Sequence, residues 1–124
     1  MTTKPVALVI EDDPGQAEVF TVALQHADYD TVTVHDGQEA LDYLEAHEPS
    51  LVIIDINLPN VTGDKVLAYI RSEIRLFDTR AILATANYRQ AEMLRNDSDL
   101  VLIKPISYTQ LKQLAERFYP NRNR

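Results

Sequence analysis

The chain has 124 residues, with 19 acidic and 12 basic side chains, so its formal charge at pH 7 is −7 with histidines neutral. This length, with 45% apolar and 25% charged residues, suits one folded domain with its own core and excludes a disordered or fibrous protein. The absence of cysteine excludes disulfides, thiolate zinc sites and cysteine nucleophiles, and the acidic balance argues against direct nucleic-acid binding over the whole surface.

The first apolar run, residues 6–10, is too short for a secretory signal or a membrane span. We therefore expect a cytoplasmic protein without membrane insertion. We expect residues 1–124 to form a single domain, with a core over about 5–119 and a frayed polar tail over 120–124.

Five short apolar runs, rich in β-branched residues, alternate with stretches of helical spacing. Several of them lack polar alternation, which is typical of strands buried on both faces of a parallel sheet. The predicted strands cover residues 6–10, 31–34, 51–54, 81–84 and 100–103. Strands that alternate with helices indicate an α/β fold with right-handed crossovers and helices on both faces.

Helix starts are marked by proline and by capping residues. The first helix should begin near Pro14 and turn Ala17, Phe20, Val22 and Leu24 toward the sheet. The capping sequences at 36–39 and 107–110 predict the starts of the second and fifth helices. Between them, residues 63–74 present an apolar stripe that includes Ile74, and residues 87–95 form a short polar helix.

Ionisable side chains follow most of these strands, at the edge where an open α/β sheet binds its ligands. Glu11 and Asp12 follow the first strand, Asp55 and Asn57 the third, Thr85 the fourth and Lys104 the fifth. Two carboxylates about 5 Å apart repel by roughly 3 kcal/mol at an effective dielectric of about 20, so such a cluster needs protons or cations. Lys104 supplies one positive charge, and Mg²⁺, which prefers oxygen ligands, would suit the remainder.

Each of these residues also has an ordinary structural interpretation. The acids at 11–13 could form a turn and a helix cap, and Asp55 could form an Asx turn. Thr85 could be the N-cap of the next helix, and Lys104 could be a surface lysine. Their shared position at the ends of the strands favours a common binding site over these separate interpretations. The three histidines have neither zinc-ligand spacing nor a catalytic constellation, so we interpret them as surface or packing residues.

Together these residues resemble the receiver domain of two-component response regulators. The resemblance covers the chain from Val6 to about Phe118 and rests on four stretches: 9–14, 55–59 with Gly63, Thr85-Ala86, and Lys104-Pro105. It implies a flavodoxin-like doubly wound sheet of five parallel strands in the order 2-1-3-4-5.

The resemblance also implies roles for the clustered residues. Asp55 is then the phosphoacceptor, Asp12 and Asp55 are direct Mg²⁺ ligands, and Glu11 acts through water. The backbone carbonyl of Asn57 completes the protein ligands, while Lys104 and Thr85 bind phosphoryl oxygens. By the same resemblance Asp13 caps the first helix, the Lys104-Pro105 bond is cis, and Asn57 and Asn87 influence loss of the phosphoryl group.

The function implied is a phosphoryl-accepting switch and not an enzyme in the usual sense. Its partners would be a sensor histidine kinase or a phosphotransfer protein and an unidentified downstream protein. The sequence departs from the family at Val101, where a tyrosine or phenylalanine is usual, and in a short segment between Thr85 and Lys104.

Two alternatives stay open from the sequence. The first is a degenerate receiver that acts as a phosphorylation-independent interaction module, an interpretation that Val101 and the short fourth helix favour. The second is a haloacid-dehalogenase-like phosphatase, because Asp55-Ile56-Asn57 approaches its D-x-D motif. That motif needs an acid where Asn57 stands.

Overall fold

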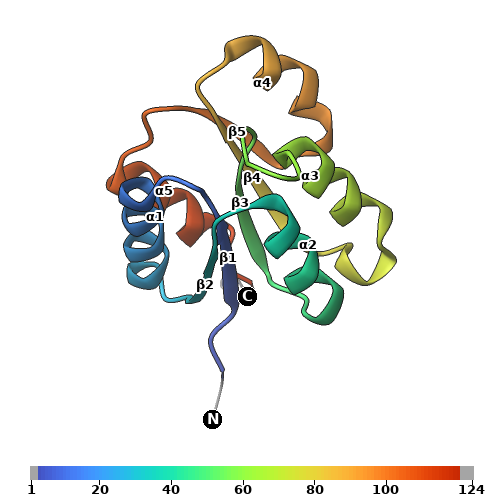
Figure 1. The fold of residues 1–124 in the computed structure, drawn as a ribbon. Helices are drawn as coiled ribbons and strands as arrows, with labels where there is room; N and C mark the ends of the chain where they lie inside the picture. Colours follow the sequence, from blue (N-terminus) through green and yellow to red (C-terminus); the bar gives the residue numbers. More distant parts are fainter. Residues whose placement is uncertain (1–2, 121–124) are drawn as a thin grey trace.

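The computed structural model describes residues 3–120, which form a five-stranded parallel sheet in the order β2-β1-β3-β4-β5 (Figure 1). The strands are β1 Val6–Ile10, β2 Asp30–Val34, β3 Leu51–Asp55, β4 Arg80–Thr85 and β5 Leu100–Ile103. The helices are α1 Pro14–His26, α2 Gly37–Ala46, α3 Gly63–Ser72, α4 Tyr88–Leu94 and α5 Tyr108–Arg117. The predicted flavodoxin-like fold and its strand order are confirmed.

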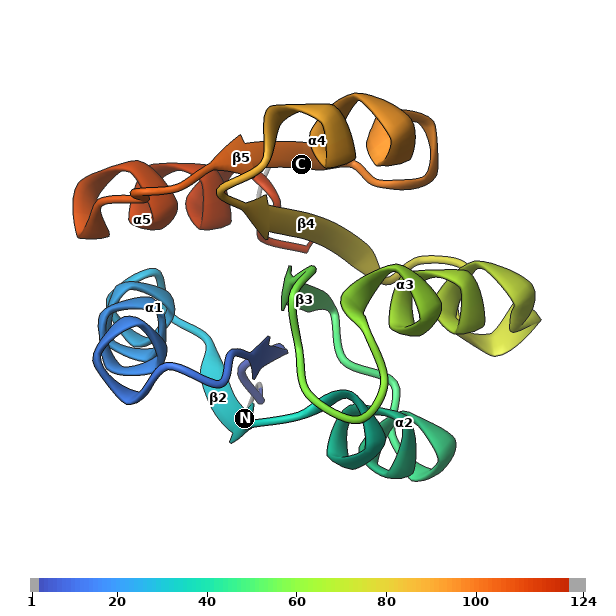
Figure 2. The same cartoon turned by 45° about the horizontal axis from the view of Figure 1, so that its top comes forward.

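The sheet separates two apolar cores. Helices α1 and α5 cover one face, and α2, α3 and α4 lie on the other (Figure 2). Successive residues of a strand point to opposite faces, so along β1 Ala7 and Val9 join the first core while Leu8 and Ile10 join the second. Because both faces are covered, the central strands are apolar except at their ends, and the sequence therefore shows them as continuous runs.

Local capping chemistry sets the helix starts as the sequence predicts. The side chains of Asp13, Asp36 and Ser107 accept hydrogen bonds from the first-turn backbone N–H groups of α1, α2 and α5. The Glu39 carboxylate in turn accepts from the backbone N–H of His35, at 2.8 Å, one residue before the position a capping box would use. The Lys104-Pro105 peptide bond is cis, in agreement with the resemblance.

Several expected details are wrong. In α1 the sheet-facing stripe contains Ala23 and not Val22, because Ala23 lies three residues after Phe20 on the same helical face. The third helix ends at Ser72, and Ile74 begins a separate 3₁₀ turn with 93% of its surface exposed. Residues 121–124 of the expected tail lie outside the described residues. Within residues 3–120, no helix combines the length and apolarity needed to cross a membrane.

Two glycines let the loops beside the sheet pack closely. A Cβ on Gly63 would lie 2.3 Å from the backbone oxygen of Asp55, and one on Gly37 would lie 1.8 Å from that of Val61. Both contacts are with backbone, which cannot move aside as a flexible side chain can. Gly63 therefore fixes how α3 approaches the end of β3, directly below Asp55.

We expect Gly63→Ala to lower the free energy of unfolding by about 1–3 kcal/mol, the range of an overpacked core. The matched control is Gly15→Ala in α1, where a Cβ would meet Asp13 at an ordinary 3.4 Å. That control should be neutral or stabilising by about 0.5–1 kcal/mol, because alanine favours helix. Urea unfolding measures both changes, and equal stability of the two variants would contradict the close approach.

Candidate functional site

The strand ends bring four predicted site residues to one edge of the sheet. Asp55 and Thr85 are the last residues of β3 and β4, and Glu11 and Lys104 directly follow β1 and β5. The strands are parallel and in register, with Ile10 opposite Ile54 and Thr85 opposite Ile103. Their carboxyl ends therefore lie side by side.

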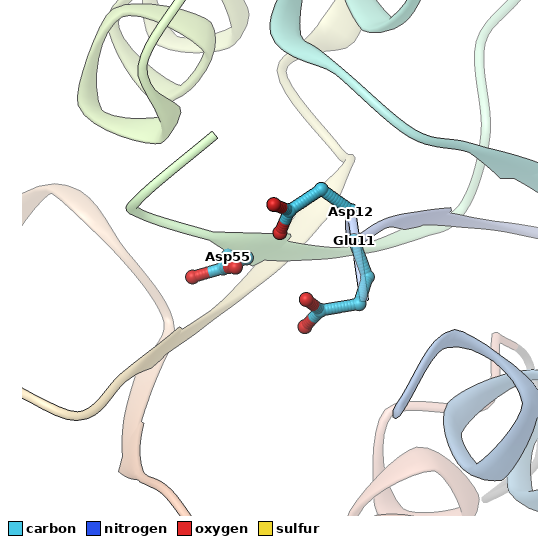
Figure 3. Close-up of side chains that lie close together, drawn as sticks. All are labelled: Glu11, Asp12 and Asp55. Atoms are coloured by element: carbon cyan, nitrogen blue, oxygen red, sulfur yellow. The ribbon is translucent and has the colours of Figure 1, made fainter. Parts of the chain in front are cut away.

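Three carboxylates gather at this edge. Glu11, Asp12 and Asp55 each offer an oxygen, and these oxygens all lie within 4.8 Å of one another (Figure 3). Glu11 is fully buried, Asp55 is 5% exposed, and Asp12 is exposed at the mouth of the cluster. At such separations each pair of negative charges repels by about 3 kcal/mol at a dielectric of about 20, so the cluster favours a bound cation.

Lys104 is the cation that the chain itself contributes. Its Nζ lies 3.0 Å from Glu11 Oε1 and 3.4 Å from Asp55 Oδ2. Burial by itself would lower the pKa of Lys104, but the hydrogen bonds and negative charges of Glu11 and Asp55 outweigh it, and the pKa is raised above its usual value. Lys104 is thus held in its charged form between the two buried acids.

Burial strongly affects the Glu11 carboxyl. Its pKa is raised from 4.5 to about 7, mainly by burial and to a smaller extent by the charge of Asp55. The hydrogen bonds from Lys104 and from the backbone N–H of Asp13, the latter at 3.2 Å, oppose it. On the other side, an imidazole nitrogen of His35 lies 3.1 Å from the backbone oxygen of Glu11. Near neutral pH, the Glu11 carboxyl is therefore divided between its protonated and its charged form.

Asp55 is held by the loop that follows β3. The backbone N–H of Asn57 donates to Asp55 Oδ1 at 3.1 Å, which is an Asx-turn contact. The turn interpretation and the site interpretation of Asp55 are therefore compatible, because one oxygen accepts from the loop while the other faces Lys104. Asn57 lies in the same loop, beside the acids, as the resemblance implies.

Thr85 is buried, and the turn after β4 holds its hydroxyl. Thr85 Oγ1 accepts from the backbone N–H of Asn87 at 3.0 Å and donates to Gln90 Oε1 at 3.1 Å. The alternative that Thr85 is an N-cap is wrong, because the side chain of Asn87 caps α4 by accepting from the N–H groups of Arg89 and Gln90. Gln90 could not be recognised from the sequence, since one polar residue in a polar helix gives no signal.

Comparison with known proteins agrees with this geometry. A family model described as the response regulator receiver domain matches residues 7–116. The polar-differentiation response regulator DivK of Brucella ovis is 32% identical over 108 residues, which cover 85% of this chain and 87% of DivK. A Haloferax volcanii relative, 33% identical over 90% of this chain, is much longer, and the chain spans only 19% of it.

Solved structures show the same fold. The chemotaxis response regulator CheY4 of Vibrio cholerae superposes with a TM-score of 0.85 at 23% identity, over 94% of this chain and 99% of that one. The response regulator TrrA of Thermotoga maritima, solved in complex with Mg²⁺-BeF, superposes with a TM-score of 0.80 at 28% identity. That superposition covers 92% of this chain and 98% of TrrA.

The pKa of Glu11 predicts a pH-dependent stability in metal-free buffer. Between pH 4.5 and about 7 the folded state holds a proton that the unfolded chain releases, so the stability that Glu11 contributes is lost as pH rises through about 7. Glu11→Gln removes this loss. The free energy of unfolding of Glu11→Gln, relative to wild type, should rise by on the order of 2–3 kcal/mol from pH 4.5 to pH 8.

The matched control for this measurement is Glu45→Gln, at an exposed position of α2. Its difference from wild type should not change over the same pH range. Urea unfolding at a series of pH values, with a chelator present, measures both differences. Parallel pH profiles for wild type and Glu11→Gln would show that Glu11 ionises normally in the fold.

Proposed function

Since the chain belongs to the response regulator receiver domains, which are signalling switches of two-component systems and not classical enzymes, we propose that Asp55 accepts a phosphoryl group. The donor would be a phosphohistidine on a sensor histidine kinase or a phosphotransfer protein. The observation that carries the proposal is the buried Asp55 carboxylate, with Lys104 Nζ 3.4 Å away and two further acids beside it.

The transfer exchanges one bond to phosphorus for another and consumes no further reactant. A carboxylate oxygen of Asp55 attacks phosphorus, an O–P bond forms, and the P–N bond to the donor imidazole breaks with its electron pair returning to nitrogen. The product is an acyl phosphate. Beyond the attack by Asp55, the protein contributes to the transfer by positioning the reacting groups and by neutralising charge.

The acid cluster fits Mg²⁺. Its donors are carboxylate oxygens, which Mg²⁺ prefers, and the loop after β3 begins beside them, where the backbone N–H of Asn57 donates to Asp55. In the proposal Asp12 and Asp55 bind the ion directly, Glu11 binds through water, and the carbonyl of Asn57 completes the protein ligands. When bound, Mg²⁺ supplies positive charge that offsets the charge on the transferring phosphoryl oxygens. The structure of TrrA in complex with Mg²⁺-BeF supports Mg²⁺ as the ion.

Lys104 and Thr85 would bind the oxygens of the phosphoryl group. Lys104, now shared between Glu11 and Asp55, would bind one phosphoryl oxygen, and the Thr85 hydroxyl would donate to another. Phosphorylation adds about −1.5 to −2 charge and new acceptor oxygens, which is enough to change how a loop is held. The loop after β4 would then alter a surface that an unidentified downstream protein binds. Asn57 and Asn87 would set how fast water removes the phosphoryl group.

A small-molecule phosphodonor with Mg²⁺ should add one phosphoryl group to the wild-type chain. Asp55→Asn should accept none, because an amide is a far weaker nucleophile than a carboxylate. The control is Asp13→Asn, which changes a neighbouring exposed acid, keeps a good helix cap and should be labelled normally. Intact-protein mass spectrometry and release of the label by hydroxylamine measure the outcome. An unlabelled wild-type chain would favour the phosphorylation-independent interaction module.

Neutralising one acid should relieve the repulsion in the cluster. Without Mg²⁺, Asp12→Asn and Asp55→Asn are each expected to raise the free energy of unfolding by up to about 2 kcal/mol, with a higher melting temperature. With free Mg²⁺ at about 100 times its Kd, wild type should gain about 2.7 kcal/mol, and the two variants much less. Asp13→Asn should behave as wild type. Equal Mg²⁺ stabilisation of all four proteins would place the ion elsewhere.

A further inference from the structure

Gln90 lies between two loops of the candidate site. Its Oε1 accepts from the Thr85 hydroxyl at 3.1 Å, and its Nε2 donates to Asn57 Oδ1 at 3.5 Å. The backbone of Asn57 in turn donates to Asp55. One carboxamide on α4 therefore connects the loop after β3, which holds Asp55, with the last residue of β4.

The Thr85 hydroxyl depends on this contact. Thr85 is fully buried, so its O–H cannot turn to solvent for an acceptor, and a buried donor without an acceptor destabilises the fold. The backbone N–H of Asn87 already occupies the hydroxyl oxygen as an acceptor. Gln90 is the acceptor for its proton. A phosphoryl oxygen on Asp55 would compete with Gln90 for that proton.

Helix α4 is attached weakly enough to respond. It has seven residues, and all of them are described, yet only Ala91 is buried. Its aromatic residue, Tyr88, is 65% exposed and so adds little packing to the helix. Val101 of β5 packs against the core between the sheet and the helices α2 and α3. The side-chain hydrogen bonds that join α4 to the site edge run through Gln90, so a change at Thr85 reaches the helix by that route.

We propose that Gln90 is a positioning residue that holds the Thr85 hydroxyl toward α4 in the unphosphorylated protein and releases it when Thr85 donates to the phosphoryl group. The inference rests on the proposed function, because the competing acceptor is the phosphoryl group on Asp55. The Thr85 hydroxyl proton is donated to Gln90 in one state and to a phosphoryl oxygen on Asp55 in the other. A phosphoryl group on Asp55 shifts the population toward the second state, in which the start of α4 is no longer held through Gln90. Removing the Gln90 acceptor therefore favours the phosphoryl-bound state.

Gln90→Met tests this by keeping the side-chain length and helix preference while removing both hydrogen bonds. Beryllofluoride with Mg²⁺ serves as the phosphoryl analogue, and calorimetric titration measures its affinity. Gln90→Met should bind about fivefold more tightly than wild type, the effect of losing one competing hydrogen bond. Gln90→Glu keeps an acceptor and should restore the wild-type affinity or weaken it. Arg89→Met, at the preceding exposed residue, should match wild type.

A Thr85→Val background separates positioning from a purely structural effect. Without the hydroxyl there is no proton to compete for, so Gln90→Met should leave the affinity of Thr85→Val unchanged. A fivefold gain that persists in Thr85→Val would overturn the inference, because Gln90 would then act on the analogue independently of Thr85. Equal affinities of Gln90→Met and wild type would overturn it as well.

Hydrogen exchange of the metal-free, unphosphorylated protein gives a readout that needs no phosphoryl group. The amides of residues 91–94 should exchange faster in Gln90→Met and in Thr85→Val, and at the wild-type rate in Arg89→Met. Unchanged exchange in Gln90→Met would refute the link between Thr85 and α4. If the wild-type chain bound no beryllofluoride, the proposed function would fail, and exchange would still decide whether Gln90 holds Thr85.

Discussion

The close approach of Glu11, Asp12 and Asp55 is the constraint on which the site depends. Carboxylates within 4.8 Å of one another oppose folding unless positive charge lies between them or one retains a proton. The chain uses both means, since Lys104 reaches the two buried acids and burial raises the pKa of Glu11 to about 7. In the proposed function, Mg²⁺ offsets the negative charge that remains in the cluster.

The fold delivers these charges through parallel register. Four strands end at one edge, so residues 44 and 93 positions away from Glu11 become its neighbours without any local sequence signal joining them. Backbone packing below the site adds precision, because Gly63 lets α3 start against the end of β3. Asp55 thus ends a fully buried strand, whereas Thr85 leads into a short helix in which only Ala91 is buried. The hydrogen bond between Gln90 and Asn57 joins these two parts of the site.

Most of the architecture could be predicted from the sequence because the signals are local. Continuous apolar runs predict strands buried on both faces, and Pro14 and the caps at Asp36 and Ser107 predict helix starts. The prediction for Val22 was wrong because it considered the apolar residue type and not the position around the helix axis. The prediction for Ile74 was wrong because the third helix ends before its apolar pattern does. Gln90 could not be recognised from the sequence, because its hydrogen bonds join it to Thr85 and Asn57, which lie outside its own helix.

The sequence by itself determined the alternation of strands and helices, the absence of cysteine chemistry and the residue types at each strand end, because these follow from composition and from order along the chain. Only the tertiary structure decided which oxygens meet, that Lys104 contacts both Glu11 and Asp55, and that the Thr85 hydroxyl turns to Gln90. Burial and distance set these interactions. Both quantities exist only once the two faces of the sheet are covered and the strand ends are aligned.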